Sequence, residues 1–341
     1  MTAGAAATQR PFAAPPILEF LPARGLRSGH AQTLAAYFLT GKLPRHTATT
    51  HAVGLDDGDQ IVLHDDAPAG WRNGDRIVVL LHGLAGCHRS PYMRRLAGKL
   101  LAVGVRSFRM DMRTAGAGRA LARLPYHGGR SPDVRAALRW LAEQFPESPV
   151  GVAGFSLGGN VALRTAGEAS EHPSGNLDRV AAVCPPVDLG ACVRSLDGAL
   201  QRPYDRWFAR ILHRDIEDWW SKVPDAPRIR FSRPPRRVLE IDELFTAPLC
   251  GFKSADDYYE QASSLPLLSR IAIPTFILAA ADDPLAPPGP LVSAELSPSV
   301  DRVITAHGGH MGYLGRGGRD PDRRWMDWRL LDWALRPGAK R

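Results

Sequence analysis

Several features that mark particular classes of protein are missing from this 341-residue sequence. Its four cysteines, Cys87, Cys184, Cys192 and Cys250, show neither a C-x-x-C pair nor a metal-ligand spacing, so we expect reduced thiols rather than a disulfide scaffold or a metal site. The absence of any apolar run of about 18 residues excludes a membrane-spanning helix. Neither G-x-x-x-x-G-K-[ST] nor G-x-G-x-x-G follows an expected strand, so we expect no nucleotide and no other cofactor.

The N-terminal segment lacks the marks of an export signal. Residues 1–16 are rich in alanine and proline, and no basic start is followed by an apolar stretch. We therefore expect a loose arm here, and we assign residues 1–25 to this N-terminal arm. We also expect the protein to be cytoplasmic.

Charge of one sign is not concentrated anywhere in the sequence. The net charge is +8, but the arginines are scattered along the chain, so we expect no nucleic-acid partner. The basic surface leaves peripheral contact with an anionic membrane open, and nothing indicates an obligate protein partner. The contents of 44% apolar and 23% charged residues are those of an ordinary globular protein.

What is present is a regular succession of strand patterns and helix patterns. Two early antiparallel strands are expected around a turn at residues 55–59, and apolar strands then alternate with amphipathic helices. Ser131 is expected to cap the helix that begins with Pro132. This order predicts an α/β fold with a mostly parallel, doubly wound sheet. The further strands are expected at residues 77–81, 105–110, 148–153, 179–184, 274–279 and 302–305.

The alternation stops between residues 189 and 264, where tryptophans, prolines and basic residues cluster without a buried-strand pattern. We interpret residues 189–264 as a helical cap inserted between a first core part, 26–188, and a second, 265–341, over the sheet edge where open α/β sheets bind ligands. A plain surface excursion is the alternative. The pair Trp219-Trp220 would line an acyl tunnel or pack the cap on the core.

Ser156 has the surroundings of a nucleophile elbow. It is the serine of Gly154-x-Ser156-x-Gly158, which follows a β-branched run and passes directly into a helix-compatible stretch. A sharp strand-to-helix turn strains the serine backbone, and flanking glycines remove the Cβ atoms that would collide there. The pattern predicts that the Ser156 hydroxyl is a nucleophile exposed above a sheet.

A serine nucleophile needs a base, and the base needs an acid to hold its tautomer. His310, between glycines directly after the last expected strand, is the candidate base. Asp283, after the strand at 274–279, is the preferred acid, because in a tight turn its neighbour Asp282 would cap backbone amides. Asp188, after the preceding strand, is the remaining alternative.

The oxyanion of an acyl-transfer reaction needs two backbone donors. The amide of Leu157, after the nucleophile, is one candidate, and that of Leu84, in the loop His82-Gly83-Leu84-Ala85-Gly86, is the other. The His82 ring is expected to brace this loop, and His127 to anchor the loop before the next helix.

From about residue 26 to 330, the chain resembles the YheT-type branch of the α/β-hydrolase superfamily. One departure concerns the loop after the fourth strand, where relatives tend to have an asparagine and an R-G pair and this chain reads Asp111-Met112-Arg113-Thr114, so the contacts of that loop are in doubt. The resembling segments are Gly29-His30-Ala31-Gln32-Thr33, residues 82–86, Tyr126-His127-Gly128-Gly129, residues 245–248, 251–252, 257–259, 262–263, 282–284 and 308–312.

The resemblance implies an α/β-hydrolase fold and carboxylic-ester hydrolysis, with the charge-relay roles on Ser156, Asp283 and His310. The implied substrates are small-molecule or lipid esters, including glycerolipids. Two alternatives remain open: acyl transfer to an alcohol with the same three residues, and a catalytically idle binding protein that keeps the fold.

Overall fold

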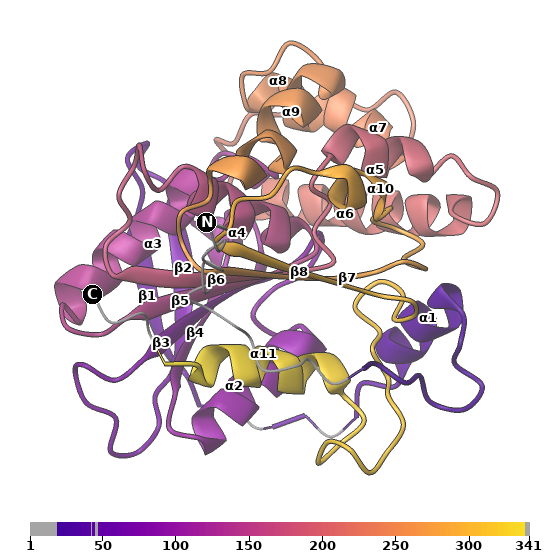
Figure 1. The fold of residues 1–341 in the computed structure, drawn as a ribbon. Coiled ribbons are helices and arrows are strands. Elements are labelled where there is room, and N and C mark those ends of the chain that lie inside the picture. The colour runs from indigo at the N-terminus through magenta and orange to yellow at the C-terminus, as the bar shows by residue number, and fades with distance from the viewer. Residues whose placement is uncertain (1–18, 42, 45–46, 338–341) are drawn as a thin grey trace, which may run out of the picture.

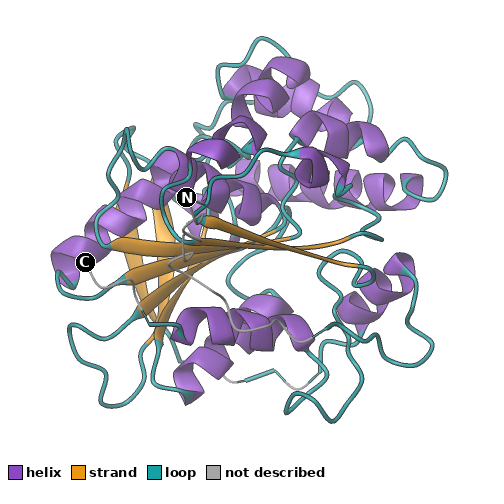
Figure 2. Ribbon diagram, in the orientation of Figure 1, coloured by secondary structure: helices purple, strands orange, loops and turns teal. Residues whose placement is uncertain are grey.

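The centre of the molecule is one eight-stranded sheet (Figures 1 and 2). The computed structural model describes residues 19–41, 43–44 and 47–337. The spatial order is β1-β2-β4-β3-β5-β6-β7-β8; β2 pairs antiparallel with β1 and β4, and every other pair is parallel. The strands are β1 (Thr49–Gly54), β2 (Gln60–Asp66), β3 (Ile77–Leu81), β4 (Arg106–Asp111), β5 (Val150–Phe155), β6 (Leu177–Val183), β7 (Thr275–Ala280) and β8 (Val300–Thr305).

Helices cover both faces of the sheet, which confirms the expected doubly wound α/β architecture. In Figure 1, α3 and α4 lie on the upper face, and α2 and α11 on the lower face. The α-helices are α1 (Gly29–Phe38), α2 (Pro91–Ala102), α3 (Ser131–Gln144), α4 (Leu157–Gly167), α5 (Leu189–Ser195), α6 (Arg202–Lys222), α7 (Val238–Ile241), α8 (Ala247–Leu249), α9 (Ala255–Ala262), α10 (Gly289–Ser293) and α11 (Trp325–Leu335). Short helices of other types are η1 (Gly116–Ala120), η2 (Asp242–Thr246) and η3 (Leu265–Arg270).

The central strand β3 shows why a continuous apolar run folds this way. All five of its residues are fully buried, and successive side chains point to opposite faces of the sheet. Val79 and Leu81 pack in the core beneath α3 and α4, whereas Val78 and Leu80 pack in the core against α2 and α11. One strand thus serves two hydrophobic cores.

Ser131 does not cap α3: it is the first residue of that helix, Arg130 is the capping residue, and the Ser131 hydroxyl instead donates to Glu168 at 2.6 Å. Residues 1–18 of the expected arm, which include the alanine- and proline-rich residues 1–16, lie outside the described residues. In the remainder of the arm, Phe20 is buried against Tyr313 and Trp325.

Between β6 and β7 the chain forms only helices and connecting segments. Residues 189–264, all of which the structure describes, contain α5 to α9 and η2, and these gather on the upper side of the molecule in Figure 1. The longest, α6, has 21 residues. Across the described parts of the chain, no helix is both long and apolar enough to span a membrane.

The turn from β5 into α4 leaves no room for side chains at its glycines. A Cβ on Gly154 would lie 2.1 Å from the carbonyl oxygen of Gly158, and a Cβ on Gly158 would lie 2.4 Å from that of His82. Both obstacles are backbone atoms, which cannot rotate away. The close approach holds the start of α4 against the carboxyl end of β3.

We expect Gly158→Ala to lower the free energy of unfolding by about 3 kcal/mol, because the added methyl group must push apart two packed backbone segments. Urea denaturation measures the change. Gly54→Ala is the matched control, since nothing lies within 4 Å of a Cβ there. An equal, small effect of the two substitutions would contradict the proposed close packing.

Candidate active site

Ser156 occupies the junction between β5 and α4 in a strained conformation. Its φ of 51° and ψ of −120° lie outside the regions that ordinary L-residues favour. The Ser156 amide donates to the carbonyl of Val183 at the end of β6, at 2.8 Å. This bond and the two glycine contacts fix the backbone, so the hydroxyl is presented at the carboxyl edge of the sheet.

His310 links the serine to an aspartate. It lies in the loop after β8, with Nε2 2.9 Å from Ser156 Oγ and Nδ1 2.9 Å from Asp283 Oδ2. Three side chains from distant parts of the sequence therefore form one continuous hydrogen-bonded row. The backbone amide of His310 donates to Thr33 Oγ1 of α1 at 2.9 Å, so α1 supports the loop that carries the imidazole.

The three candidate acids differ clearly in their contacts. Asp283 Oδ1 accepts the amides of Leu285 and Ala286, which leaves Oδ2 facing the imidazole. Asp282 instead accepts the amide of Gly309 through Oδ1. Asp188 caps α5 by accepting the amide of Ala191 at 2.8 Å, so only Asp283 joins Ser156 and His310.

The loop after β3 lies directly against the serine. A Cβ on Gly83 would stand 3.1 Å from Ser156 Cβ. Two tyrosine hydroxyls hold the loop: Tyr92 accepts the amide of Gly83 at 2.9 Å, and Tyr126 accepts the amide of Ala85 at 2.8 Å. The sequence did not predict either of these roles, although Tyr126 lies in the segment 126–129 that resembles the family.

The amides of Leu84 and Leu157 remain free to act as donors. Leu84 lies between the two amides that the tyrosines engage, and Leu157 is the first residue of α4, whose amide has no partner one turn earlier in the helix. Neither amide donates to another group within the described chain. Both residues line the same cavity.

His82 braces the loop through its ring, as the sequence predicted. Met112 donates its amide to Nε2 at 3.2 Å, so Nδ1 carries the proton and donates to the carbonyl of Gly83 at 2.8 Å. Complete burial lowers the pKa of His82, which keeps the ring neutral. His127 likewise anchors its own loop, since its Nδ1 accepts the amide of Gly129.

Asp111, at the position where the chain departs from the family pattern, is the centre of a buried hydrogen-bond cluster. Its Oδ2 accepts from His64 Nε2 at 2.9 Å and from His88 Nδ1 at 2.6 Å, and the two rings stack with centroids 3.6 Å apart. Burial opposes ionisation, but the bonds from both histidines hold the pKa of Asp111 below its usual value. The cluster ties the far end of the 82–88 loop to β4.

Two sets of side chains among the described residues could each converge on a single metal ion. One is Asp111 with its two histidines, and the other joins Cys184 to Asp283 and His310. In both sets the distances between histidine nitrogens and carboxylate oxygens, 2.6–2.9 Å, are those of direct hydrogen bonds. All four cysteines are free thiols, and burial raises the pKa of Cys184 well above its usual value.

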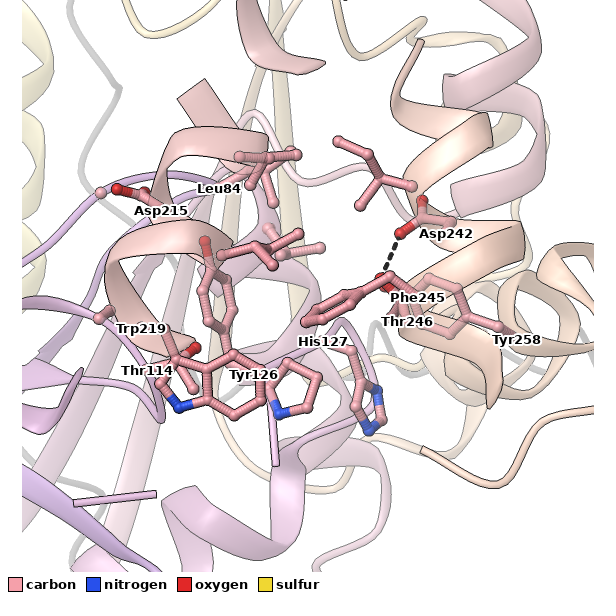
Figure 3. A pocket seen from close by; sticks show the side chains of 17 residues that line it. Leu84, Thr114, Tyr126, His127, Asp215, Trp219, Asp242, Phe245, Thr246 and Tyr258 are labelled. Carbon is pink, nitrogen blue, oxygen red and sulfur yellow. Dashed lines mark hydrogen bonds between the residues drawn. The ribbon is translucent and has the colours of Figure 1, made fainter. Parts of the chain in front are cut away.

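A small cavity of about 60 Å³ lies beneath the helices of residues 189–264 (Figure 3). Leu157, the residue after Ser156, is part of its lining, whereas Ser156, Asp283 and His310 are not. Leu84 and Leu157 form its wall on the core side, and α6 and η2 supply the opposite wall. Trp219 lines the cavity and is buried, donating to the carbonyl of Ala122, whereas Trp220 is not among its lining residues. The α6 and η2 residues are Leu212, Asp215, Ile216, Trp219, Asp242, Phe245 and Thr246.

Asp242 is the unusual group in this cavity. Its carboxylate accepts from Thr246 Oγ1 at 2.8 Å and from the hydroxyl of Tyr259 at 2.7 Å (Figure 3 shows the first bond). Burial outweighs these bonds and raises the pKa of Asp242 to about 6. The Asp242 carboxyl group in the cavity wall is therefore neutral in weak acid and negatively charged above neutral pH.

Comparison with known proteins places these features in a family. The α/β hydrolase fold family matches residues 76–316. The candidate esterase YheT of Escherichia coli (strain K12) is 33% identical over 92% of each chain, and human phospholipase ABHD3 is 26% identical over 84% of this chain and 71% of its own length. The crystal structure of 2,6-dihydroxy-pseudo-oxynicotine hydrolase is 20% identical, with a TM-score of 0.55 over 90% of this chain and 72% of that one.

The raised pKa of Asp242 predicts a stability effect with a definite sign. The unfolded carboxyl ionises near pH 4 and the folded one near pH 6, so its stabilising contribution is complete below about pH 4 and is lost as the pH rises through about 6. We expect Asp242→Asn, which keeps the hydrogen-bonding shape, to gain on the order of 2 kcal/mol over the parent chain between pH 4 and pH 7. Urea denaturation across this range measures it.

The exposed Asp225, whose side chain is 72% accessible, provides the control. Asp225→Asn should leave the pH dependence of stability as it is in the parent chain. An Asp242→Asn curve that runs parallel to the parent curve would refute the assignment.

Proposed function

The chain belongs to the α/β-hydrolase fold family and to its YheT-type branch, and from this membership we propose that it is a serine hydrolase of carboxylic esters. Ser156 is the nucleophile, His310 the general base and Asp283 the acid that orients it. The observation that carries the proposal is the position of His310 between the other two, with both imidazole nitrogens 2.9 Å from their partners. The names of the relatives, an esterase and a phospholipase, support the ester class.

In the first half-reaction, Ser156 Oγ attacks the ester carbonyl carbon while His310 Nε2 takes the hydroxyl proton. The carbonyl oxygen becomes an oxyanion, which the amides of Leu84 and Leu157 stabilise by hydrogen bonding. The intermediate then expels the alcohol, which receives the proton held by His310. The acyl group remains bound to Ser156 as an ester.

The second half-reaction repeats the chemistry with water. His310 removes a proton from the water, the resulting hydroxide attacks the acyl carbonyl, and the carboxylic acid leaves as Ser156 recovers its proton. Asp283 stabilises the imidazolium in both steps. Its two bonds from the amides of Leu285 and Ala286 hold the carboxylate in place, so it needs no reorganisation during turnover.

Residues 189–264 act as the cap of this site in the same proposal, with the chain before and after them forming the core. The support is the composition of the cavity, whose outer wall comes from α6 and η2 and whose inner wall comes from the loops beside Ser156. The acyl group of the substrate occupies this cavity. Its apolar lining, with Leu157, Ile216 and Phe245, matches a hydrocarbon chain.

The finer choice among esters depends on acyl length. Likeness to a phospholipase favours lipid esters, whereas a cavity of about 60 Å³ has room for only a few carbon atoms, since about 150 Å³ is filled by one benzene. Longer chains must therefore displace cap side chains. We assign short acyl groups to the cavity as it stands, and longer ones to a cap that moves.

The catalytic assignment is tested by labelling with a fluorophosphonate probe and by hydrolysis of p-nitrophenyl esters. The parent chain should be labelled and active, Ser156→Ala should be neither, and Asp283→Asn should lower kcat by about 10⁴-fold, because the imidazole loses its orienting carboxylate. Asp282→Asn is the matched control and should retain most of the activity, since an asparagine oxygen still accepts the amide of Gly309.

Four outcomes would count against the proposal. Labelling that persists in Ser156→Ala means that another serine reacts, and equal losses in the two aspartate variants mean that the acid is misassigned. An unlabelled, inactive parent chain would favour the idle binding protein. If a competing alcohol takes the acyl group almost completely, the chain is an acyltransferase with the same three residues.

The cavity assignment predicts a change in chain-length preference. Ile216→Ala removes three carbons from the cap wall, so we expect the ratio of kcat/KM for longer over shorter p-nitrophenyl esters to rise about tenfold, the typical worth of a methylene or two in an apolar pocket. Leu200→Ala, at a cap residue that is 69% exposed, should leave the ratio unchanged. An unchanged ratio in Ile216→Ala would place the acyl group elsewhere.

A further inference from the structure

The outer face of α6 carries a row of cationic side chains that the proposed chemistry does not use. Arg206, Arg210 and Arg214 are exposed and stand four residues apart, so they project from one side of the helix, with His213 beside them. The residues of α6 that line the acyl cavity lie on another side. The basic row therefore takes no part in the lining of that cavity.

A second cationic segment faces this row across an open cavity of about 480 Å³. The cavity is lined by Arg206, Arg210 and His213 from α6, and by Arg233, Pro234, Pro235 and Arg236 from the segment before α7. Two acidic groups lie close by: Glu240 Oε1 is 3.0 Å from Arg233, and Glu217 Oε1 is 3.7 Å from His213. They leave a clear excess of positive charge.

Three of the four arginines have no acidic partner of their own. In the part of the chain that the structure describes, the guanidinium groups of Arg206, Arg210 and Arg236 form no ion pair. Guanidinium groups present paired N–H donors that match phosphate oxygens, and several of them around one cavity suit a ligand with a phosphate group. The cavity therefore has the chemistry of a phosphate site.

An exposed apolar patch adjoins the basic row. At the end of α1, Tyr37, Phe38 and Leu39 are 55%, 72% and 61% exposed. The ring of Tyr37 packs edge-on against Trp207 of α6, with centroids 5.2 Å apart. Trp207 in turn lies one helical turn from Arg210, so apolar and cationic side chains form one continuous surface.

We propose that this surface, made of the end of α1, the outer face of α6 and the segment 233–236, binds an anionic phospholipid membrane. The arginines hold lipid phosphates, and the aromatic and aliphatic side chains of α1 enter the headgroup region. A small soluble phosphate would explain the cavity but not the apolar patch beside it. The combination is typical of proteins that lie on a membrane without crossing it.

The position of the surface connects it to the catalytic centre. The same helix α1 holds the His310 loop through Thr33, and His30 Nδ1 lies 3.0 Å from the hydroxyl of Tyr204 in α6. Docking along α1 and α6 would thus bring the carboxyl edge of the sheet close to the lipid. The binding itself does not depend on the proposed ester hydrolysis.

Co-sedimentation with vesicles tests the proposal, and Ser156→Ala is used so that hydrolysis cannot alter the lipid. The protein should sediment with vesicles of equal parts phosphatidylcholine and phosphatidylglycerol, but not with phosphatidylcholine alone. High salt should weaken the binding because it screens the arginines. Arg206→Gln combined with Arg210→Gln should weaken it about 30-fold, since each basic residue at an anionic surface is worth roughly fivefold.

Matched variants separate this surface from general charge. Arg72→Gln combined with Arg139→Gln removes the same charge from exposed positions outside this surface, and should bind as the parent does. Phe38→Ser combined with Leu39→Ser should weaken binding to the vesicles, although these substitutions leave the net charge of the protein unchanged. Circular dichroism and thermal unfolding show that each variant is folded.

Four results would overturn the proposal: no binding to anionic vesicles; equal binding to both lipid compositions; unchanged binding in the Arg206/Arg210 variant; or equal loss in the two arginine pairs. Calorimetry with inorganic phosphate distinguishes the source of the anion, because binding of phosphate without binding of vesicles identifies a site for a soluble phosphate. Preference for a single-stranded oligonucleotide over vesicles would likewise reject the membrane as the partner.

Discussion

The site depends on one constrained peptide segment, the turn that carries Ser156 from β5 into α4. A serine at φ 51° is unfavourable in isolation, and it persists because the neighbouring backbones allow no other path. Gly154 and Gly158 approach carbonyl oxygens too closely for any side chain, and the Ser156 amide is tied to β6. The same packing that strains the turn also places the free amide of Leu157 next to the hydroxyl. The proposed nucleophile and one proposed oxyanion donor are therefore positioned by one feature of the backbone.

Around this turn, the other groups are fixed by contacts that leave little freedom of movement. Asp283 is held by two backbone amides, His310 by Asp283 and Thr33, and the loop of Leu84 by the hydroxyls of Tyr92 and Tyr126. Such pre-organisation is what electrostatic stabilisation of a transition state requires, because the donors need not be rearranged as charge develops. The neutral His82 and the ionised Asp111 play a supporting part on the far side of the loop.

The sequence was informative where the physics is local. Apolar runs between turn residues marked the strands, and the elbow glycines and the glycines around His310 marked the nucleophile and the candidate base. The sequence could only rank Asp283 above Asp282 as the candidate acid. The choice between them depends on which carboxylate lies against the imidazole of His310, and that contact joins segments 27 residues apart. Both aspartates accept backbone amides, so capping alone would not have distinguished them.

The helix α1, the tyrosine supports and the cationic cavity were not predicted from the sequence, because each depends on segments that meet only in the folded chain. The prediction that Ser131 caps α3 was wrong because its hydroxyl donates to Glu168, which lies 37 residues away in the sequence.

Because α1 supports the loop that carries His310, a fragment that keeps this loop in place must begin before the segment that matches the family. The family match covers residues 76–316, yet Thr33 accepts the amide of His310, and the carbonyl of Gly29 lies so near Gly309 that a Cβ there would approach it to 2.2 Å. A fragment cut to the matched region would keep all three residues of the proposed charge relay and would lose the helix that supports the His310 loop. The part of the chain that holds the proposed catalytic residues in place is thus longer at its amino-terminal side than the segment that matches the family, and α1 contributes to this proposed site as well as to the surface.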